Sequence, residues 1–333
     1  MILLHSALAA LLVLAGPAPA APDPAAARAY LATIEPSSDL QAFLDRTVES
    51  LLDQDRALRG STLRVALLDL PSDGPPRLAQ RGGDVPMYPA SVVKFVYLMA
   101  AYVWQERGAL RIDAELDDAL THMIQESSNA ATQRALALIT GAQPGPPLDA
   151  EAYAEFRRRR LTIDDWLRTL GIDDLHCVAP TYDDDGDMVG RDEQFLKDRS
   201  VAGALPSHGT EYSNRNAMTA LGTVKLLALL ATDRALTAGD SAAVRHRMQR
   251  DLATQPHLVH RITGGAARTP GLQVYAKSGT WGPIYADAGI VRDASGRQFA
   301  VAVFTERKPA YRGEFIAELT HRAVQELLVG RAP

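Results

Sequence analysis

Apolar positions along the chain change their spacing several times, and each change predicts a different kind of structure. In residues 40–52 the apolar side chains recur every three or four positions, which predicts a helix that Ser38 caps. Residues 63–70 (LRVALLDL) form a mostly apolar run closed by a proline, which predicts a strand. From residue 91 to about residue 255 the spacing is again mainly helical.

The final part of the chain returns to strand-like runs and ends in a helix. Three strands are predicted at 272–281, 285–293 and 298–306, and the turn DASGR joins the last two as a hairpin. Residues 312–329 have the spacing of an amphipathic helix. A sheet whose two parts enclose a long helical segment indicates an α+β fold, with the first and last helices flanking an antiparallel sheet.

The order of these elements predicts one domain of two lobes over residues 36–333. Residues 36–81 and 266–333 form the expected α/β lobe, and residues 82–265 form an all-helical lobe inserted between its halves. Residues 21–35 are expected to be a linker.

The first twenty residues have the layout of a secretory signal peptide, with an apolar core and a small-residue cleavage site at Ala20. The absence of Lys and Arg before Arg28 leaves an uncleaved anchor as the alternative, although the apolar run is shorter than the roughly 20 residues of a membrane span. We expect a periplasmic or secreted protein with no stable membrane span after cleavage. Cys177 is the only cysteine, so no intramolecular disulfide can form.

Composition and charge do not favour a nucleic-acid partner. It has 333 residues, 47% of them hydrophobic, and a formal net charge of −5. The basic run Arg157–Arg160 is interpreted as a solvated helix face, because a nucleic-acid site needs a broader basic surface. We expect a monomer.

Candidate chemistry begins with Ser91 and Lys94, which lie three positions apart in an apolar run after a proline. In a helix that starts near Ala90 the two side chains share one face. Burial and the positive end of the helix would favour a neutral lysine that can take a proton from the serine. A Ser-x-x-Lys pair also occurs by chance, so this motif alone is a weak signal.

Two further motifs follow in order. Ser127-Ser128-Asn129 stands at the junction of two helical patterns, and Lys277-Ser278-Gly279-Thr280 stands on a predicted strand. With Ser91 and Lys94 they resemble the motif trio of class A β-lactamases and penicillin-binding proteins. The resemblance covers most of residues 36–333 and implies a β-lactamase/transpeptidase-like fold.

The resemblance also implies the roles of the catalytic residues. Ser91 attacks a carbonyl, Lys94 is its base, and Ser127 passes a proton to the departing nitrogen. Asn129 binds the substrate's side-chain amide.

The strand motif supplies the remaining groups that the resemblance implies. Lys277 holds a substrate carboxylate with help from the hydroxyls of Ser278 and Thr280. The backbone N–H groups of Ser91 and Thr280 form the oxyanion hole, and Gly279 leaves room for the acyl chain. The resemblance implies no metal and no organic cofactor.

Several departures from the family pattern bear on activity. Ser127 follows Ser91 by only 36 residues, which predicts a trimmed and more open site. The Glu-x-x-Leu-Asn pattern that supplies the deacylating base is not found, and Glu193 is the best substitute, with the acids of residues 183–187 nearby. The strand after the Lys277 motif lacks the family's usual arginine, so Arg292 or Arg307 is considered in its place.

Other motifs receive less weight. Tyr212-Ser213-Asn214 is an alternative to the Ser127 motif, and Trp281 is expected at the rim of the site. A metal site at His257 and His260, with His246 nearby, is disfavoured because no Cys, Asp or Glu shares their spacing. A calcium loop within 183–193 is disfavoured because its glycine is misplaced.

Three functions remain open. The first is a β-lactamase or a closely related serine hydrolase. The second is a D-Ala-D-Ala carboxypeptidase or esterase that acts on peptidoglycan-type peptides or small esters. The third is a penicillin-binding or sensor protein that is acylated and then deacylates slowly.

Overall fold

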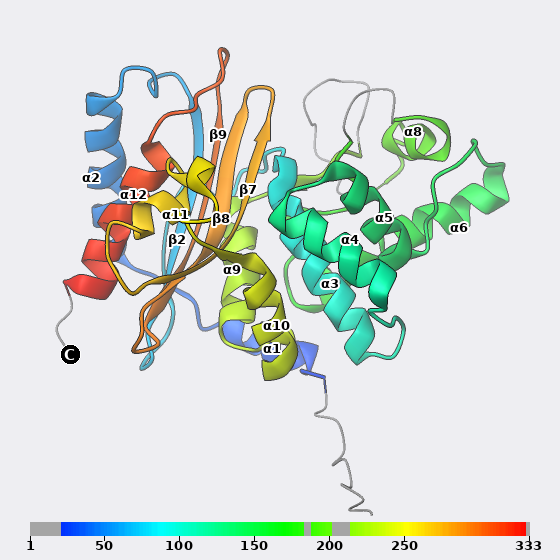
Figure 1. Cartoon of the computed structure of the whole chain (residues 1–333), viewed down its shortest axis with the longest axis horizontal. Helices are drawn as coiled ribbons and strands as arrows, with labels where there is room; N and C mark the ends of the chain where they lie inside the picture. The colour runs from blue at the N-terminus through cyan, green and yellow to red at the C-terminus, as the bar shows by residue number, and fades with distance from the viewer. Residues whose placement is uncertain (1–20, 183–187, 202–213, 331–333) are drawn as a thin grey trace, which may run out of the picture.

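The computed structural model describes residues 21–182, 188–201 and 214–330 (Figure 1). Its main sheet has seven strands in the order β1-β3-β2-β9-β8-β7-β6. All neighbouring pairs are antiparallel except β1 with β3. The strands are β1 Glu35–Pro36, β2 Thr62–Leu70, β3 Arg77–Arg81, β6 Gln249–Arg250, β7 Gln273–Trp281, β8 Ile284–Arg292 and β9 Gln298–Glu306. The predicted strands and the α+β fold are therefore confirmed.

The centre of strand β2, Val65 to Leu68, is apolar at every position because both faces of the sheet are covered. Val65 and Leu67 pack with one cluster of buried residues, and Ala66 and Leu68 pack with another on the opposite face. Side chains alternate between faces along a strand, so a continuous apolar run indicates a sheet buried on both sides.

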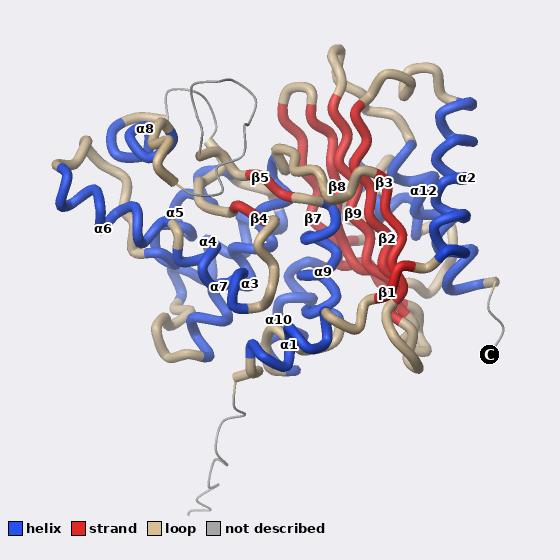
Figure 2. Tube along the Cα trace, turned by 180° about the vertical axis from the view of Figure 1, so that it is seen from behind, coloured by secondary structure: helices blue, strands red, loops and turns tan. Residues whose placement is uncertain are grey.

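Helices α2 (Ser38–Gln54), α11 (Ile262–Ala266) and α12 (Phe315–Val324) cover one face of the sheet (Figure 1). Helix α9 (Ala220–Ala231) contacts β2, β8 and β9 and lies on the opposite face (Figure 2). The range 82–265 therefore contributes more than a helical lobe, since it also contains α9 and β6. Ser37 caps α2 one residue before the predicted cap, and the helix ends at Gln54.

The remaining helices, apart from α1, form a second body beside the β7 side of the sheet (Figure 1). It contains α3 Lys94–Glu106, α4 Ala114–Gln125, α5 Asn129–Thr140, α6 Ala150–Arg160, α7 Thr162–Thr169, α8 Gly190–Leu196 and α10 Ala238–Met248. A short sheet of β4 (Leu175–His176) and β5 (Ala217–Met218) joins it to the start of α9.

The expected linker at 21–35 contains helix α1 (Pro24–Leu31), which Asp23 caps. Arg28 donates a hydrogen bond to the carbonyl of Thr169 at the end of α7, so the helix packs on the folded body. The predicted signal peptide, residues 1–20, lies outside the described residues. Within the described ranges, no helix is long and apolar enough to cross a membrane.

Candidate active site

Ser91 lies in a single 3-10 turn, Ala90–Val93, that leads directly into α3. The prediction placed a helix start near Ala90, and the structure adds that its first turn is the tighter 3-10 form. Residues three apart eclipse each other in that form, so Ser91 and Lys94 share one side of the turn. Ala90 has a φ of 48°, an unusual backbone conformation for a residue with a side chain.

Lys94 is fully buried and points at the loop between α4 and α5. Its Nζ lies 2.6 Å from the carbonyl oxygen of Ser127, 2.7 Å from Asn129 Oδ1 and 3.4 Å from Ser127 Oγ. The loop presents these acceptors because Ser127 has a φ of 59° and Ser128 caps α5 through its side chain. Ser128 thus anchors the motif by accepting a hydrogen bond from the backbone N–H of Ala131.

Lys277 reaches the same hydroxyl from the sheet. Its Nζ donates to Ser127 Oγ at 2.8 Å and to the carbonyl of Ser278 at 2.8 Å. Burial, and next the charge of Lys94, hold the pKa of Lys277 well below that of a free lysine, while Asp287 opposes this shift. Two amines therefore meet at Ser127 Oγ, the position from which a proton can pass to a leaving group.

Strand β7 lies against the Ser91 turn at Gly279. A Cβ at this glycine would lie 2.5 Å from the carbonyl oxygen of Pro89 and 3.1 Å from the backbone nitrogen of Ser91. The glycine is therefore required by the packing of backbone on backbone, a different reason from the room for an acyl chain that the sequence suggested. The close approach brings the Ser91 turn beside Thr280, whose N–H is the second expected oxyanion donor.

These groups line one pocket of about 450 Å³. Its lining residues are Ser91, Ser127, Asn129, His257, Leu258, Arg261, Ser278, Thr280 and Tyr285. Ser91 and the loop and strand motifs predicted from sequence thus converge in space, and Lys94 and Lys277 join them beneath the surface.

Arg261 is the main residue of the pocket that the sequence did not reveal. It precedes α11, its Nη2 donates to Thr280 Oγ1 at 2.6 Å, and its guanidinium lies 3.5 Å from the ring centre of Tyr285. Arg292, considered for this role, lies at the opposite end of β8 from Tyr285, about 20 Å or more away at the usual rise of a strand. No motif surrounds Arg261, so only the fold identifies it.

Trp281 stands at the edge of the site, as expected. It is 40% exposed and packs edge to face on Tyr88, with ring centres 5.3 Å apart. The guanidinium of Arg215 lies 5.3 Å from the Trp281 ring.

Asn129 is held from its far side by the segment that follows β4. Its Oδ1 accepts from Thr181 Oγ1 at 2.8 Å, and its Nδ2 donates to the carbonyl of Tyr182 at 3.1 Å. The Tyr182 hydroxyl in turn hydrogen-bonds Asp192 of α8. The amide of Asn129 therefore has a fixed orientation.

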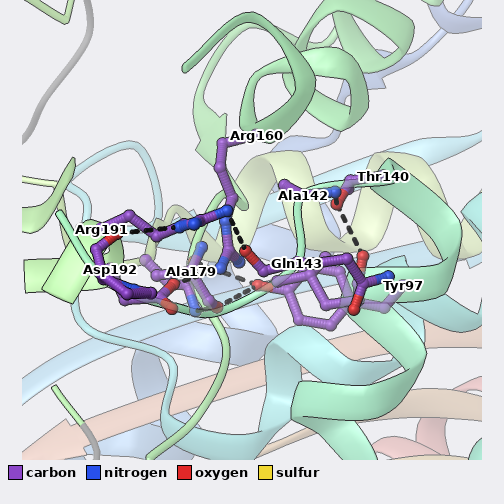
Figure 3. A network of polar contacts seen from close by, with 11 residues as sticks. Tyr97, Thr140, Ala142, Gln143, Arg160, Ala179, Arg191 and Asp192 are labelled. Carbon is purple, nitrogen blue, oxygen red and sulfur yellow. Dashed lines mark hydrogen bonds and ion pairs between the residues drawn. The ribbon is translucent and has the colours of Figure 1, made fainter. Parts of the chain in front are cut away.

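Asp192 forms a buried ion pair with Arg160, which corrects the interpretation of the basic run 157–160 as a solvated face at its last residue only, since Arg157, Arg158 and Arg159 are exposed to solvent. Arg160 is 3% exposed and its guanidinium lies 5.1 Å from the ring centre of Phe156, so α6 turns its last arginine inward. Figure 3 shows this pair beside the backbone of Ala179, which accepts a hydrogen bond from the Tyr97 hydroxyl at 2.6 Å. Burial raises the pKa of Asp192, and Arg160 opposes the shift.

Other predicted residues lie away from the pocket or outside the description. Glu193 does not line the pocket, and its carboxylate pairs with Lys197 at 2.7 Å on the surface of α8. Asn214 is buried and donates to the carbonyls of Phe195 and Asp198, whereas Tyr212 and Ser213 of the alternative motif lie outside the described residues.

The acids of residues 183–187 also lie outside the described residues, with most of the possible calcium loop. In the described part of the chain, no group of three or more His, Cys, Asp or Glu side chains could hold a metal ion.

The sheet, its helical covers and the second helical body together form the α+β fold of β-lactamases and transpeptidases. The family model described as the beta-lactamase enzyme family matches residues 159–327, about half of the chain. The chain belongs to this family.

Solved structures show the same fold at low identity. A beta-lactamase from Sphaerobacter thermophilus aligns at 18% identity and a TM-score of 0.59, covering 86% of this chain and 97% of that one. The TLA-3 extended-spectrum beta-lactamase aligns at 16% and 0.60, covering 86% and 99%. A mutant of PBP-A, solved as an acyl-enzyme complex with penicillin G, aligns at 16% and 0.57, covering 88% and 97%. The comparison with curated proteins gives no match.

Proposed function

We propose that the protein is an exported serine hydrolase that is acylated on Ser91 by β-lactams or by related amides and esters. Ser91 Oγ attacks the carbonyl carbon while its proton passes to Lys94 Nζ. The C–N bond then breaks as Ser127 donates its proton to the departing nitrogen and takes the proton held by Lys94 in return. Water later cleaves the ester. The N–H groups of Ser91 and Thr280 would bind the oxyanion.

One observation carries this proposal. Three segments far apart in the sequence place Ser91, Ser127 and Thr280 around a single pocket, with two buried amines at Ser127. Burying two amines side by side is costly, so such an arrangement indicates chemistry rather than stability.

The substrate we propose carries a carboxylate. Ser278 and Thr280 offer hydroxyl donors to the pocket, Lys277 lies beneath its surface, and Arg261 adds a buried positive charge behind Thr280. Asn129, which is held by Thr181 and Tyr182, would bind the amide of the acyl side chain. A β-lactam or a peptidoglycan-type peptide has both groups.

A second candidate function is favoured by the lining of the pocket. Among its described lining residues there is no Asp or Glu, and Glu193 is paired elsewhere. Hydrolysis of an acyl-serine needs a general base that orients water. We therefore propose two alternatives to a β-lactamase: a penicillin-binding protein that deacylates slowly, or a D-Ala-D-Ala carboxypeptidase or esterase.

Labelling with a fluorescent penicillin tests the proposal. The wild type should form a covalent adduct, Ser91→Ala should form none, and Ser72→Ala, a serine in an exposed turn, should label as the wild type does. Labelling of Ser91→Ala at the wild-type rate would place the nucleophile elsewhere.

A further inference from the structure

A buried carboxylate lies directly behind the cationic end of the pocket. Asp287 is 1% exposed in the middle of β8, opposite Ser278 of β7. Residues paired across two strands share a face of the sheet, so Asp287 lies on the face covered by α11. It does not line the pocket.

Both oxygens of Asp287 are held by the backbone. Oδ2 accepts from the N–H of Ile262 at 3.0 Å, and Oδ1 accepts from the N–H of Ala288 at 3.0 Å. Ile262 is the residue after Arg261, so the carboxylate fixes the point from which the Arg261 side chain extends. Arg261 then donates to Thr280 Oγ1 and to the carbonyl of Ala286.

The surroundings of Asp287 are strongly cationic. Arg261, Lys277 and Arg250 all act on its charge, and Lys94 acts on Lys277 in turn. Tyr285 and Arg312 complete the ionisable groups around Arg261. Several buried cations so close together need a counter-charge, because an uncompensated buried charge costs several kcal/mol.

We propose that Asp287 is a positioning residue of this site: its buried carboxylate fixes Arg261 behind Thr280 and provides the counter-charge to the buried cations there while a carboxylate-bearing substrate binds. The strand that lacks the family's usual arginine thus contributes an acid, and the arginine comes from residue 261. This inference rests on the proposed function for its substrate but not for its charge balance.

The sign of the pH effect follows from the charges. The negative charge of Asp287 favours protonated Lys277, so its removal should lower the pH at which Lys277 loses its proton. The alkaline limb of the acylation rate should therefore move to lower pH.

The test compares Asp287→Asn with the wild type, since asparagine keeps an acceptor for Ile262 and removes the charge together with the acceptor for Ala288. The alkaline limb for a fluorescent penicillin should move down by about one pH unit. Asp69→Asn removes a buried carboxylate of β2 that is paired with Arg77 of β3, and it should leave the alkaline limb of the acylation rate unchanged. An unchanged limb in a folded Asp287→Asn would overturn the proposal.

A second measurement separates this inference from the proposed function. Titration of the Lys277 side chain by NMR in the free protein should show the same downward shift in Asp287→Asn. If the wild type is never acylated, the proposed function fails, and the NMR shift still decides the role of Asp287. If Asp287→Asn does not fold, the double variant with Arg261→Gln should restore folding by removing one cation, and its failure would refute the charge account.

Discussion

Gly279→Ala is the sharpest test of how the site is assembled. The new Cβ would lie 2.5 Å from the carbonyl oxygen of Pro89, and 3.1 Å from the backbone nitrogens of Ser91 and Val92. Contacts below about 3.0 Å are not tolerated, and the obstructing atoms belong to backbone that cannot rotate away. Strand β7 and the Ser91 turn must therefore separate by about 0.5–1 Å.

That separation acts on catalysis more than on stability. Overpacking of this kind costs about 1–3 kcal/mol of stability. The two expected oxyanion donors stand on the two pieces that move apart, and loss of one such donor lowers a rate by about 10² to 10³. We expect acylation about 10²-fold slower in a folded protein.

The assay is stopped-flow acylation by a fluorescent penicillin, with thermal unfolding followed by circular dichroism. Gly239→Ala is the matched control, because a Cβ there meets nothing within 4 Å and alanine favours helix α10. An acylation rate within about threefold of the wild type in Gly279→Ala would refute this account of the oxyanion hole.

Three further predictions follow from the same geometry. Lys94→Ala should slow acylation at least about 10²-fold, measured by the same stopped-flow assay, because it removes the proposed base; a wild-type rate would exclude that role. With nitrocefin we expect a burst of one equivalent followed by slow turnover, since no described carboxylate lines the pocket. Linear turnover without a burst would contradict this prediction. If Glu193→Gln then showed a burst, Glu193 would be identified as a deacylating base. Asp192→Asn should lower the midpoint of thermal unfolding by roughly 5–10 °C, because the buried Arg160 loses its charge partner at a cost of about 3–5 kcal/mol of stability. An unchanged midpoint would contradict this prediction. Arg158→Gln, on the exposed face of α6, is the control.

Local patterns determined the elements of this protein and the order of its motifs. The strands at 62–70, 273–281, 284–292 and 298–306 could be predicted because their apolar runs and turns are local signals. Ser91 and Lys94 are three residues apart, so their shared side of the turn also follows from sequence.

Tertiary structure decided which surfaces those elements present. Helix α9 is apolar over nearly its whole length, as α3 of the second body is, yet α9 covers the sheet. The apolar spacing shows that a helix is buried and does not show which surface it packs against. In the same way, nothing in the run 157–160 marks Arg160 as the residue that turns inward to Asp192.

The sequence by itself determined the fold class, the family resemblance and the three motifs that converge on the pocket. Only the tertiary structure placed Arg261 behind Thr280 and Asp287 beside the start of α11. It also brought the backbone of Pro89 so close to residue 279 that only a glycine fits there. These three contacts join residues 19, 25 and 190 positions apart, respectively. They depend on strand register and on how the lobes pack, and no periodicity in the chain records either one.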